Sequence, residues 1–218
     1  MNFNLINKEE WLRKEYYKHY TENVPCTYSL TCNIDFTDLY SVLKKENIKP
    51  YAAQIYTIST TVNQYSEFRM SINANGDLGY WDQLNPSYTV FNKKTETFSS
   101  IWTEFNSSFT DFYGACSKDI EHYSSATCLK PKADEPENVF NVSCFPWVSF
   151  TGFNLNVGVN VPYLLPIFTI GKFFKEGGKT LMPVAIQAHH AVCDGFHVAK
   201  FINSLQELIF SHEKWIYS

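Results

Sequence analysis

A stretch near the C-terminus reads Gln187-Ala188-His189-His190-Ala191-Val192-Cys193-Asp194-Gly195-Phe196-His197. The apolar run before it, residues 181–186, has the composition of a strand. After it, apolar residues recur at helical spacing, at Val198, Phe201, Ile202, Leu205, Leu208 and Ile209. The paired histidines are therefore predicted to lie where a strand ends and a helix begins. Because successive strand side chains point to opposite faces, one of His189 and His190 is expected to be buried structure and the other free to react.

Asp194 and Gly195 stand directly before the predicted helix. An aspartate at this position can cap the exposed N–H groups of the helix, and a glycine allows the backbone to turn tightly. A carboxylate that is buried at such a turn needs a cation or hydrogen-bond donors beside it. We therefore expect a partner for Asp194 from elsewhere in the chain.

Further from this stretch, strand and helix patterns alternate along the whole sequence. Helices are predicted over residues 7–20, 37–46, 50–65 and 108–123, and strands over 25–35, 68–73, 77–81, 88–91, 96–102, 139–150 and 167–174. Asn75-Gly76 predicts a hairpin turn, and residues 176–179 predict a turn into the strand that carries the histidines. The polar segment 130–138 is interpreted as a surface loop. The expected architecture is a mixed β-sheet with helices packed on it, an α/β or two-layer α+β fold forming a single domain over residues 1–218.

Composition excludes several classes of protein. The formal net charge of −4 argues against a generic nucleic-acid-binding protein, which requires a basic face. No stretch is apolar for the length that a bilayer requires, and the N-terminus does not resemble a signal peptide. The six cysteines contain no C-x-x-C pair, so we expect reduced thiols, no metal site, a cytoplasmic location and unused Asn-x-Ser sequons.

The spacing His190-x-x-x-Asp194-Gly195 resembles that of the coenzyme A-dependent acyltransferases, which include chloramphenicol acetyltransferases and the catalytic domains of dihydrolipoyl acyltransferases. The surrounding segment, residues 189–198, is similar to the chloramphenicol acetyltransferase version. Trp11-Leu12-Arg13, and Asn141-Val142-Ser143 followed by Pro146-Trp147-Val148, also match that family. The resemblance extends from Trp11 to about Leu208.

This resemblance implies chloramphenicol O-acetyltransferase activity, with direct acetyl transfer from acetyl-coenzyme A to the primary hydroxyl of chloramphenicol. His190 would be the general base, because a neutral imidazole can accept a hydroxyl proton near physiological pH. Ser143 would donate to the oxyanion, and Thr169 would support it through ordered water. Arg13 and Asp194 would form a structural ion pair that keeps the imidazole in place.

The resemblance also implies binding residues and partners. Positions that match the antibiotic pocket are Tyr20, Val24, Cys26, Tyr28, Phe98, Phe153, Leu155 and Ile167. Trp147, Lys172 and Phe173 match the coenzyme A side. Lys130 departs from the family, which commonly has an aromatic residue there. The family forms homotrimers with the active site at the subunit interface, His190 coming from one subunit and most of the antibiotic pocket from its neighbour.

Other readings of the same residues stay open. His189, His190, Asp194 and His197 are residue types that bind metals, although an adjacent pair diverges on a strand. Cys193 or Cys26 would be a nucleophile if a nearby imidazole generated the thiolate. Ser143 would be the nucleophile of a triad with His190 and Asp194, although no G-x-S-x-G motif surrounds Ser143. The alternatives to this function are a coenzyme A-dependent acyltransferase of the same fold with another acceptor and a catalytically silent binding module.

Overall fold

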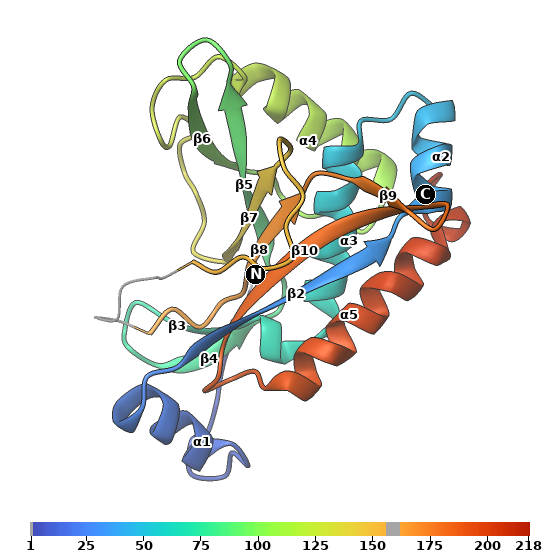
Figure 1. Cartoon of the computed structure of the whole chain (residues 1–218). Coiled ribbons are helices and arrows are strands. Elements are labelled where there is room, and N and C mark those ends of the chain that lie inside the picture. The colour runs from blue at the N-terminus through green and yellow to red at the C-terminus, as the bar shows by residue number, and fades with distance from the viewer. Residues whose placement is uncertain (1, 156–161) are drawn as a thin grey trace.

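The computed structural model describes residues 2–155 and 162–218. Its centre is a seven-stranded mixed sheet in the order β2-β10-β8-β7-β5-β6, with β9 paired to β10 (Figure 1). The strands are β2 (Thr27–Asp35), β5 (Asn85–Asn92), β6 (Thr97–Trp102), β7 (Val139–Phe145), β8 (Ile167–Gly171), β9 (Phe174–Glu176) and β10 (Lys179–His189). Strand β7 runs parallel to β5 and β8, and the other neighbours are antiparallel. The predicted mixed sheet is confirmed.

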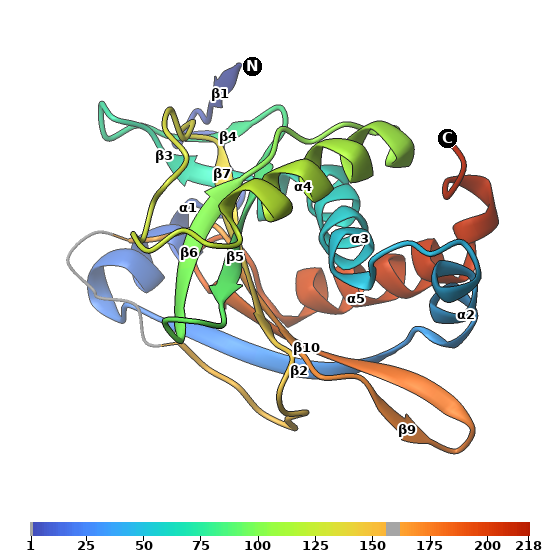
Figure 2. The same cartoon turned by 90° about the horizontal axis from the view of Figure 1, so that it is seen from above.

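Four helices cover one face of this sheet (Figure 2). They are α2 (Thr37–Lys45), α3 (Pro50–Gln64), α4 (Phe109–Tyr123) and α5 (Gly195–Phe210). The strand side chains that point toward them are fully buried and apolar, and include Ile34, Val142, Phe168, Val184 and Ile186. Burying such side chains contributes about 1.5 to 3 kcal/mol each, so this layer supplies the main core.

The opposite face of the sheet carries smaller and more polar side chains. Register aligns Ser143 of β7 with Thr169 of β8, then with Ala185 of β10 and Thr31 of β2. Because aligned residues on paired strands point to the same side, these four residues form a row across the sheet. The chain thus presents small polar groups on the face that the four helices leave uncovered.

A second, three-stranded sheet lies beside the N-terminal helix. It has the order β1-β4-β3, with strands β1 (Phe3–Leu5), β3 (Met70–Ile72) and β4 (Leu78–Trp81). A small core joins Met70 and Leu78 of this sheet to Ala191 and Val192 of the histidine segment, with Trp11 packed against them. The segment that follows β10 is therefore packed between the two sheets and the N-terminal region.

Most predicted elements are confirmed, including the Asn75-Gly76 turn, where Gly76 has φ +84°. The predicted helix over residues 7–20 is wrong at its start, because α1 spans only Lys14–Lys18 and continues as a π-helical turn, His19–Asn23. Asn7 instead closes a turn, accepting hydrogen bonds from Glu9, Glu10 and Trp11. The strand predicted over 139–150 ends at Phe145, since Pro146 has no N–H to donate. The strand predicted over 167–174 is divided between β8 and β9, and β1 was not predicted.

None of the helices among the described residues has the length and apolar composition needed to cross a membrane.

Candidate active site

The histidine pair lies where β10 ends, as its sequence predicts. His189 is the last strand residue and is 6% exposed, and its Nδ1 accepts a hydrogen bond from the Ala191 backbone at 3.2 Å. Burial, together with the neighbouring His190, lowers the pKa of His189. His190 begins the following turn, where its backbone N–H donates to the Cys26 carbonyl at 2.9 Å. His189 is therefore a buried structural residue inside β10, whereas His190 lies outside the strand, on the turn that follows it.

Two tyrosine rings hold the His190 ring. Tyr20 stacks on it with a centroid distance of 4.1 Å and an interplanar angle of 7°, and Tyr28 meets it edge-on at 5.3 Å. His190 Nδ1 is buried and has no hydrogen-bond partner among residues 2–155 and 162–218. The stacking fixes the plane of the imidazole and encloses one of its two nitrogens.

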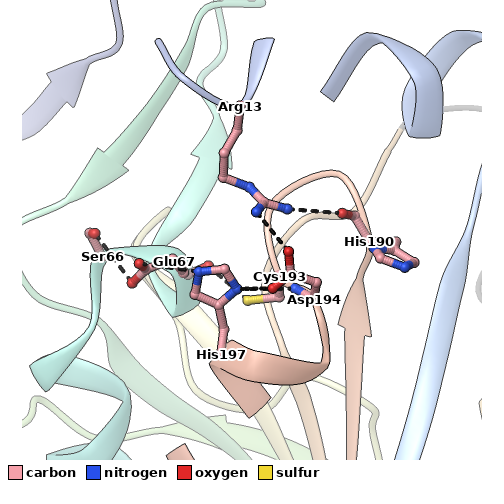
Figure 3. Close-up of polar contacts among 7 residues, drawn as sticks. All are labelled: Arg13, Ser66, Glu67, His190, Cys193, Asp194 and His197. Carbon is pink, nitrogen blue, oxygen red and sulfur yellow. Dashed lines mark hydrogen bonds and ion pairs between the residues drawn. The ribbon is translucent and has the colours of Figure 1, made fainter. Parts of the chain in front are cut away.

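Arg13 reaches the histidine segment from the N-terminal region. Its Nη1 donates to Asp194 Oδ2 at 2.8 Å, and its Nη2 lies 3.5 Å from the His190 carbonyl oxygen (Figure 3). Burial alone would raise the pKa of Asp194, but the hydrogen bond and charge of Arg13, together with His197, hold that pKa below its ordinary value. The contact that the family resemblance implied thus connects the N-terminal region to the turn that carries His190.

Ser143 and Thr169 are neighbours on the face of the sheet that the four helices leave uncovered. They are aligned on the parallel strands β7 and β8. Strand β7 pairs with β5 only as far as Tyr88 and Val142, and a cavity of about 550 Å³ opens where the two strands separate. Its walls are mainly apolar and comprise Tyr51, Thr89, Val90, Phe91, Phe98, Ile120, Ser124, Ser143, Cys144, Phe145, Pro146 and Trp147. The structure thereby brings Phe98 and Trp147 together with Ser143.

Within one chain, His190 is remote from this cavity. Ser143 aligns with Ala185 of β10 through Thr169, two strand steps away. His190 lies five residues beyond Ala185, so at about 4.8 Å per strand and 3.3 Å per residue the two backbones are separated by about 19 Å. Side chains of histidine and serine do not span that distance. A single chain therefore does not bring both groups to one reacting atom.

The other predicted binding residues occupy three environments. Phe153, Leu155 and Ile167 lie close together at the open sheet face, where Gln187 Oε1 accepts from the Leu155 backbone at 3.0 Å. Val24 is exposed, and Cys26 lies beside the His190 turn. The sequence predictions gave no role to Gln187, a buried polar residue inside the otherwise apolar strand before the histidines.

The residues predicted for the coenzyme A side do not share one environment. Lys172 is exposed, whereas Phe173 packs on the core rings of Phe36 and Tyr40 at centroid distances of 5.3 and 5.0 Å. Lys130 forms an ion pair with Glu135. A role for Phe173 in binding coenzyme A stays a prediction, and its ring contacts are those of a core residue.

The alternative chemistries find little support in the geometry. No group of three histidine, cysteine, aspartate or glutamate side chains that could hold a metal ion occurs among the residues described. Burial raises the pKa of Cys32 to about 11 and that of Cys144 to about 12, and it also raises the pKa of Cys193. These three thiols are held in the protonated form, which is a poor nucleophile, whereas a nucleophilic role for Cys26 stays a prediction. Asp194 is directed at Arg13, and the separation of Ser143 from His190 excludes an intrachain triad.

Comparison with known proteins identifies the family of the chain. The family profile described as "Chloramphenicol acetyltransferase" matches residues 1–206. The chain belongs to the chloramphenicol acetyltransferase family. A chloramphenicol acetyltransferase of Clostridium butyricum is 55% identical over 216 residues, covering 99% of each chain, and one of Clostridium perfringens is 51% identical with the same coverage.

Solved structures show that the fold is shared more widely than the sequence. A chloramphenicol acetyltransferase structure superimposes with a TM-score of 0.82 at 20% identity, covering 95% of this chain and 100% of that chain. A dihydrolipoamide acetyltransferase of Azotobacter vinelandii gives a TM-score of 0.68 at 17% identity, covering 93% of this chain and 88% of the other. The mixed sheet with helices is thus the family fold, and a dihydrolipoamide acetyltransferase shares it.

Proposed function

We propose that the chain transfers the acetyl group of acetyl-coenzyme A to the primary hydroxyl of chloramphenicol. The observation that carries the proposal is the His190 ring held between Tyr20 and Tyr28, on a turn fixed by the Arg13–Asp194 contact. Relatives of about 50% identity over nearly the whole chain are named for this activity. A dihydrolipoyl acyltransferase shares the fold at only 17% identity, which makes that acceptor the weaker alternative.

In the proposed mechanism His190 acts as the base. Because its Nδ1 is enclosed, Nε2 is the nitrogen that accepts the proton of the attacking hydroxyl. Ser143 donates a hydrogen bond to the oxygen that gains negative charge on the thioester carbonyl, with Thr169 beside it. Such a donor lowers the barrier by about 2.7 to 4 kcal/mol. Asp194 and Arg13 hold the turn and take no proton.

The cavity beside Ser143 suits the arm of the acetyl donor. It is lined mainly by apolar groups, and the side chains of Trp147 and Phe98 are each more than half exposed at its surface. A mainly apolar cleft with the Ser143 hydroxyl in its wall matches a thioester on a slender chain. Lys172 is exposed and would meet a phosphate of the cofactor.

We infer that the working enzyme is a homotrimer with each active site between two subunits. The separation of about 19 Å between the His190 and Ser143 backbones supports this, because the proposed chemistry needs both groups within about 3 Å of the reacting atoms. His190, Asp194 and Arg13 would come from one subunit, and Ser143, Thr169 and Trp147 from its neighbour. A closed ring of three subunits satisfies every such site at once.

Free cysteines fit a reducing compartment, and we propose that the enzyme acts in the cytoplasm, where acetyl-coenzyme A is available.

Release of free thiol from acetyl-coenzyme A tests the proposed function. We expect turnover with chloramphenicol and none with dihydrolipoamide, and we expect His190→Ala to abolish turnover while antibiotic binding stays measurable. Near-normal turnover in His190→Ala would remove His190 as the base. If the wild-type protein showed no turnover with any hydroxyl or thiol acceptor, the chain would instead be a binding module.

A further inference from the structure

We propose that His197 and Glu67 form a positioning pair that holds Asp194 from the side opposite Arg13. The inference rests on the proposed function, because the turn that they would hold carries His190. His197 lies in the first turn of α5, and Glu67 lies on the short helix η2 (Ser66–Phe68). Neither residue touches the His190 ring in the described contacts, so their effect would pass through Asp194.

The two oxygens of Asp194 have different partners. Oδ2 receives the hydrogen bond of Arg13, while Oδ1 lies against His197 Nδ1, a contact that is an ion pair when the imidazole is protonated. His197 Nε2 in turn lies 3.6 Å from Glu67 Oε1. Figure 3 shows the side chains in the order Arg13, Asp194, His197 and Glu67. Two of these groups, Arg13 and His197, have side chains that are only 17% exposed.

Charge explains this order. An imidazole with a carboxylate at each nitrogen can donate to both only as the imidazolium ion, in which both nitrogens carry hydrogen. In that protonation state the charges alternate from the Arg13 guanidinium to the Glu67 carboxylate. A cation in the first turn of a helix opposes the helix dipole, and two flanking carboxylates offset that cost. The contacts of His197 therefore point to a link between Asp194 and Glu67.

A tight, hydrogen-bonded turn connects Asp194 to His190. The N–H groups of Val192 and Cys193 both donate to the His189 carbonyl, at 3.1 and 3.0 Å. The Cys193 thiol lies 3.4 Å from the Glu67 carbonyl oxygen, which fastens the same turn to η2 a second time. A shift of the Asp194 carboxylate would therefore be transmitted to the imidazole of His190.

A purely structural role for His197 is the competing explanation. Its Nδ1 also lies 3.2 Å from the backbone nitrogen of Asp194, so a neutral ring would accept that N–H and cap α5. Glutamate at this helix position would preserve such a cap but has no proton to give to Asp194. Asparagine would retain a donor close to the position of Nδ1. These two substitutions separate the roles.

The experiment measures kcat, both KM values and the thermal midpoint for the wild type and for His197→Ala, His197→Asn, His197→Glu and Glu67→Gln. Positioning predicts that kcat of His197→Ala falls about tenfold with both KM values within about twofold, since displacement of a reacting group costs rate rather than binding. His197→Asn should recover most of this loss and His197→Glu none of it, and Glu67→Gln should lower kcat about threefold. His122→Ala, which truncates an exposed histidine on α4, is the matched control and should leave kcat unchanged.

A double-substitution cycle with Arg13→Ala tests the shared target. If both residues act through Asp194, the combined loss of kcat should be smaller than the product of the separate losses. Full kcat in folded His197→Ala or in His197→Glu, or losses that multiply, would overturn the inference. Wild-type turnover tests the proposed function separately, and the same cycle measured by thermal unfolding needs no turnover. If His197→Ala and Arg13→Ala lowered the thermal midpoint independently of each other, that result would also count against the pair.

Discussion

Mixing two defective variants should restore activity if each site is shared between subunits. His190→Ala keeps an intact Ser143, and Ser143→Ala keeps an intact His190. In a randomly mixed ring, a site works when the subunit that supplies His190 is the serine variant and its neighbour is the histidine variant. In an equal mixture each of these two subunits is the required variant with a probability of about one half. About one quarter of the sites, and hence about one quarter of wild-type activity, is expected. If both groups acted from the same chain, every site would carry one defect and no activity would return.

The assay dissociates an equal mixture of the two variants in denaturant, allows reassociation and measures thiol release. Each variant reassociated alone gives the background, which for Ser143→Ala is about 10² to 10³ below wild type. A mixture of His190→Ala with Asp194→Asn is the matched control, because both defects lie in the half of the site that carries His190 and neither chain supplies an intact version of that half. Recovery in that control, or no recovery in the first mixture although mixed rings form, would refute the shared site.

Three further predictions follow from single groups. Ser143→Ala should raise the activation free energy by about 2.7 to 4 kcal/mol, which lowers kcat, while both KM values stay nearly unchanged. A rise in KM larger than the fall in kcat would make Ser143 a binding residue. The pKa of His189 is lower in the folded protein than in the unfolded chain, where a histidine has a pKa of about 6.5. As the pH falls below about 6.5, the unfolded chain therefore takes up a proton that folded His189 does not, and the free energy of unfolding should decline. Urea unfolding at pH 7.5 and 5.5 should show a smaller decline for His189→Gln, and an equal decline would exclude His189 as its source. Lys132 contacts Asp119 at 2.7 Å and the Trp102 carbonyl at 2.8 Å, so Lys132→Met should reduce the free energy of unfolding by about 2 kcal/mol, and a change below about 0.5 kcal/mol would show that the pair is solvent-screened.

Local periodicity was a good guide wherever the pattern of burial was regular. The helix α3 and the strand β10 follow their predicted spans closely because one face or both faces of each are packed in the main core. The prediction over residues 7–20 was wrong at its start because Trp11 leaves helical geometry to pack in the second core beside the small sheet. Helix propensity contributes tenths of a kcal/mol per residue, whereas burial of a tryptophan contributes several times more.

The candidate site divides in the same way. The motif around His190 and Asp194 could be recognised in the sequence, since residue types at fixed spacing determine which side of a strand end each group faces. Its contact with Arg13 was implied only by resemblance, and the positions of His197 and Glu67 around Asp194 were not predicted. No spacing rule relates Glu67 to His197, because the two are separated by most of the chain and meet through packing alone.

The sequence by itself determined the mixed sheet, the strand-to-helix turn and the divergence of the two histidines, because these depend on short-range periodicity and hydrogen bonding. Tertiary structure alone decided which carboxylate meets which cation, and it alone showed that β5 and β7 separate beside Ser143 to open a cavity. It also placed His190 too far from Ser143 to act within one chain. Those distances arise from strand register and from the packing of remote segments, which local sequence does not encode.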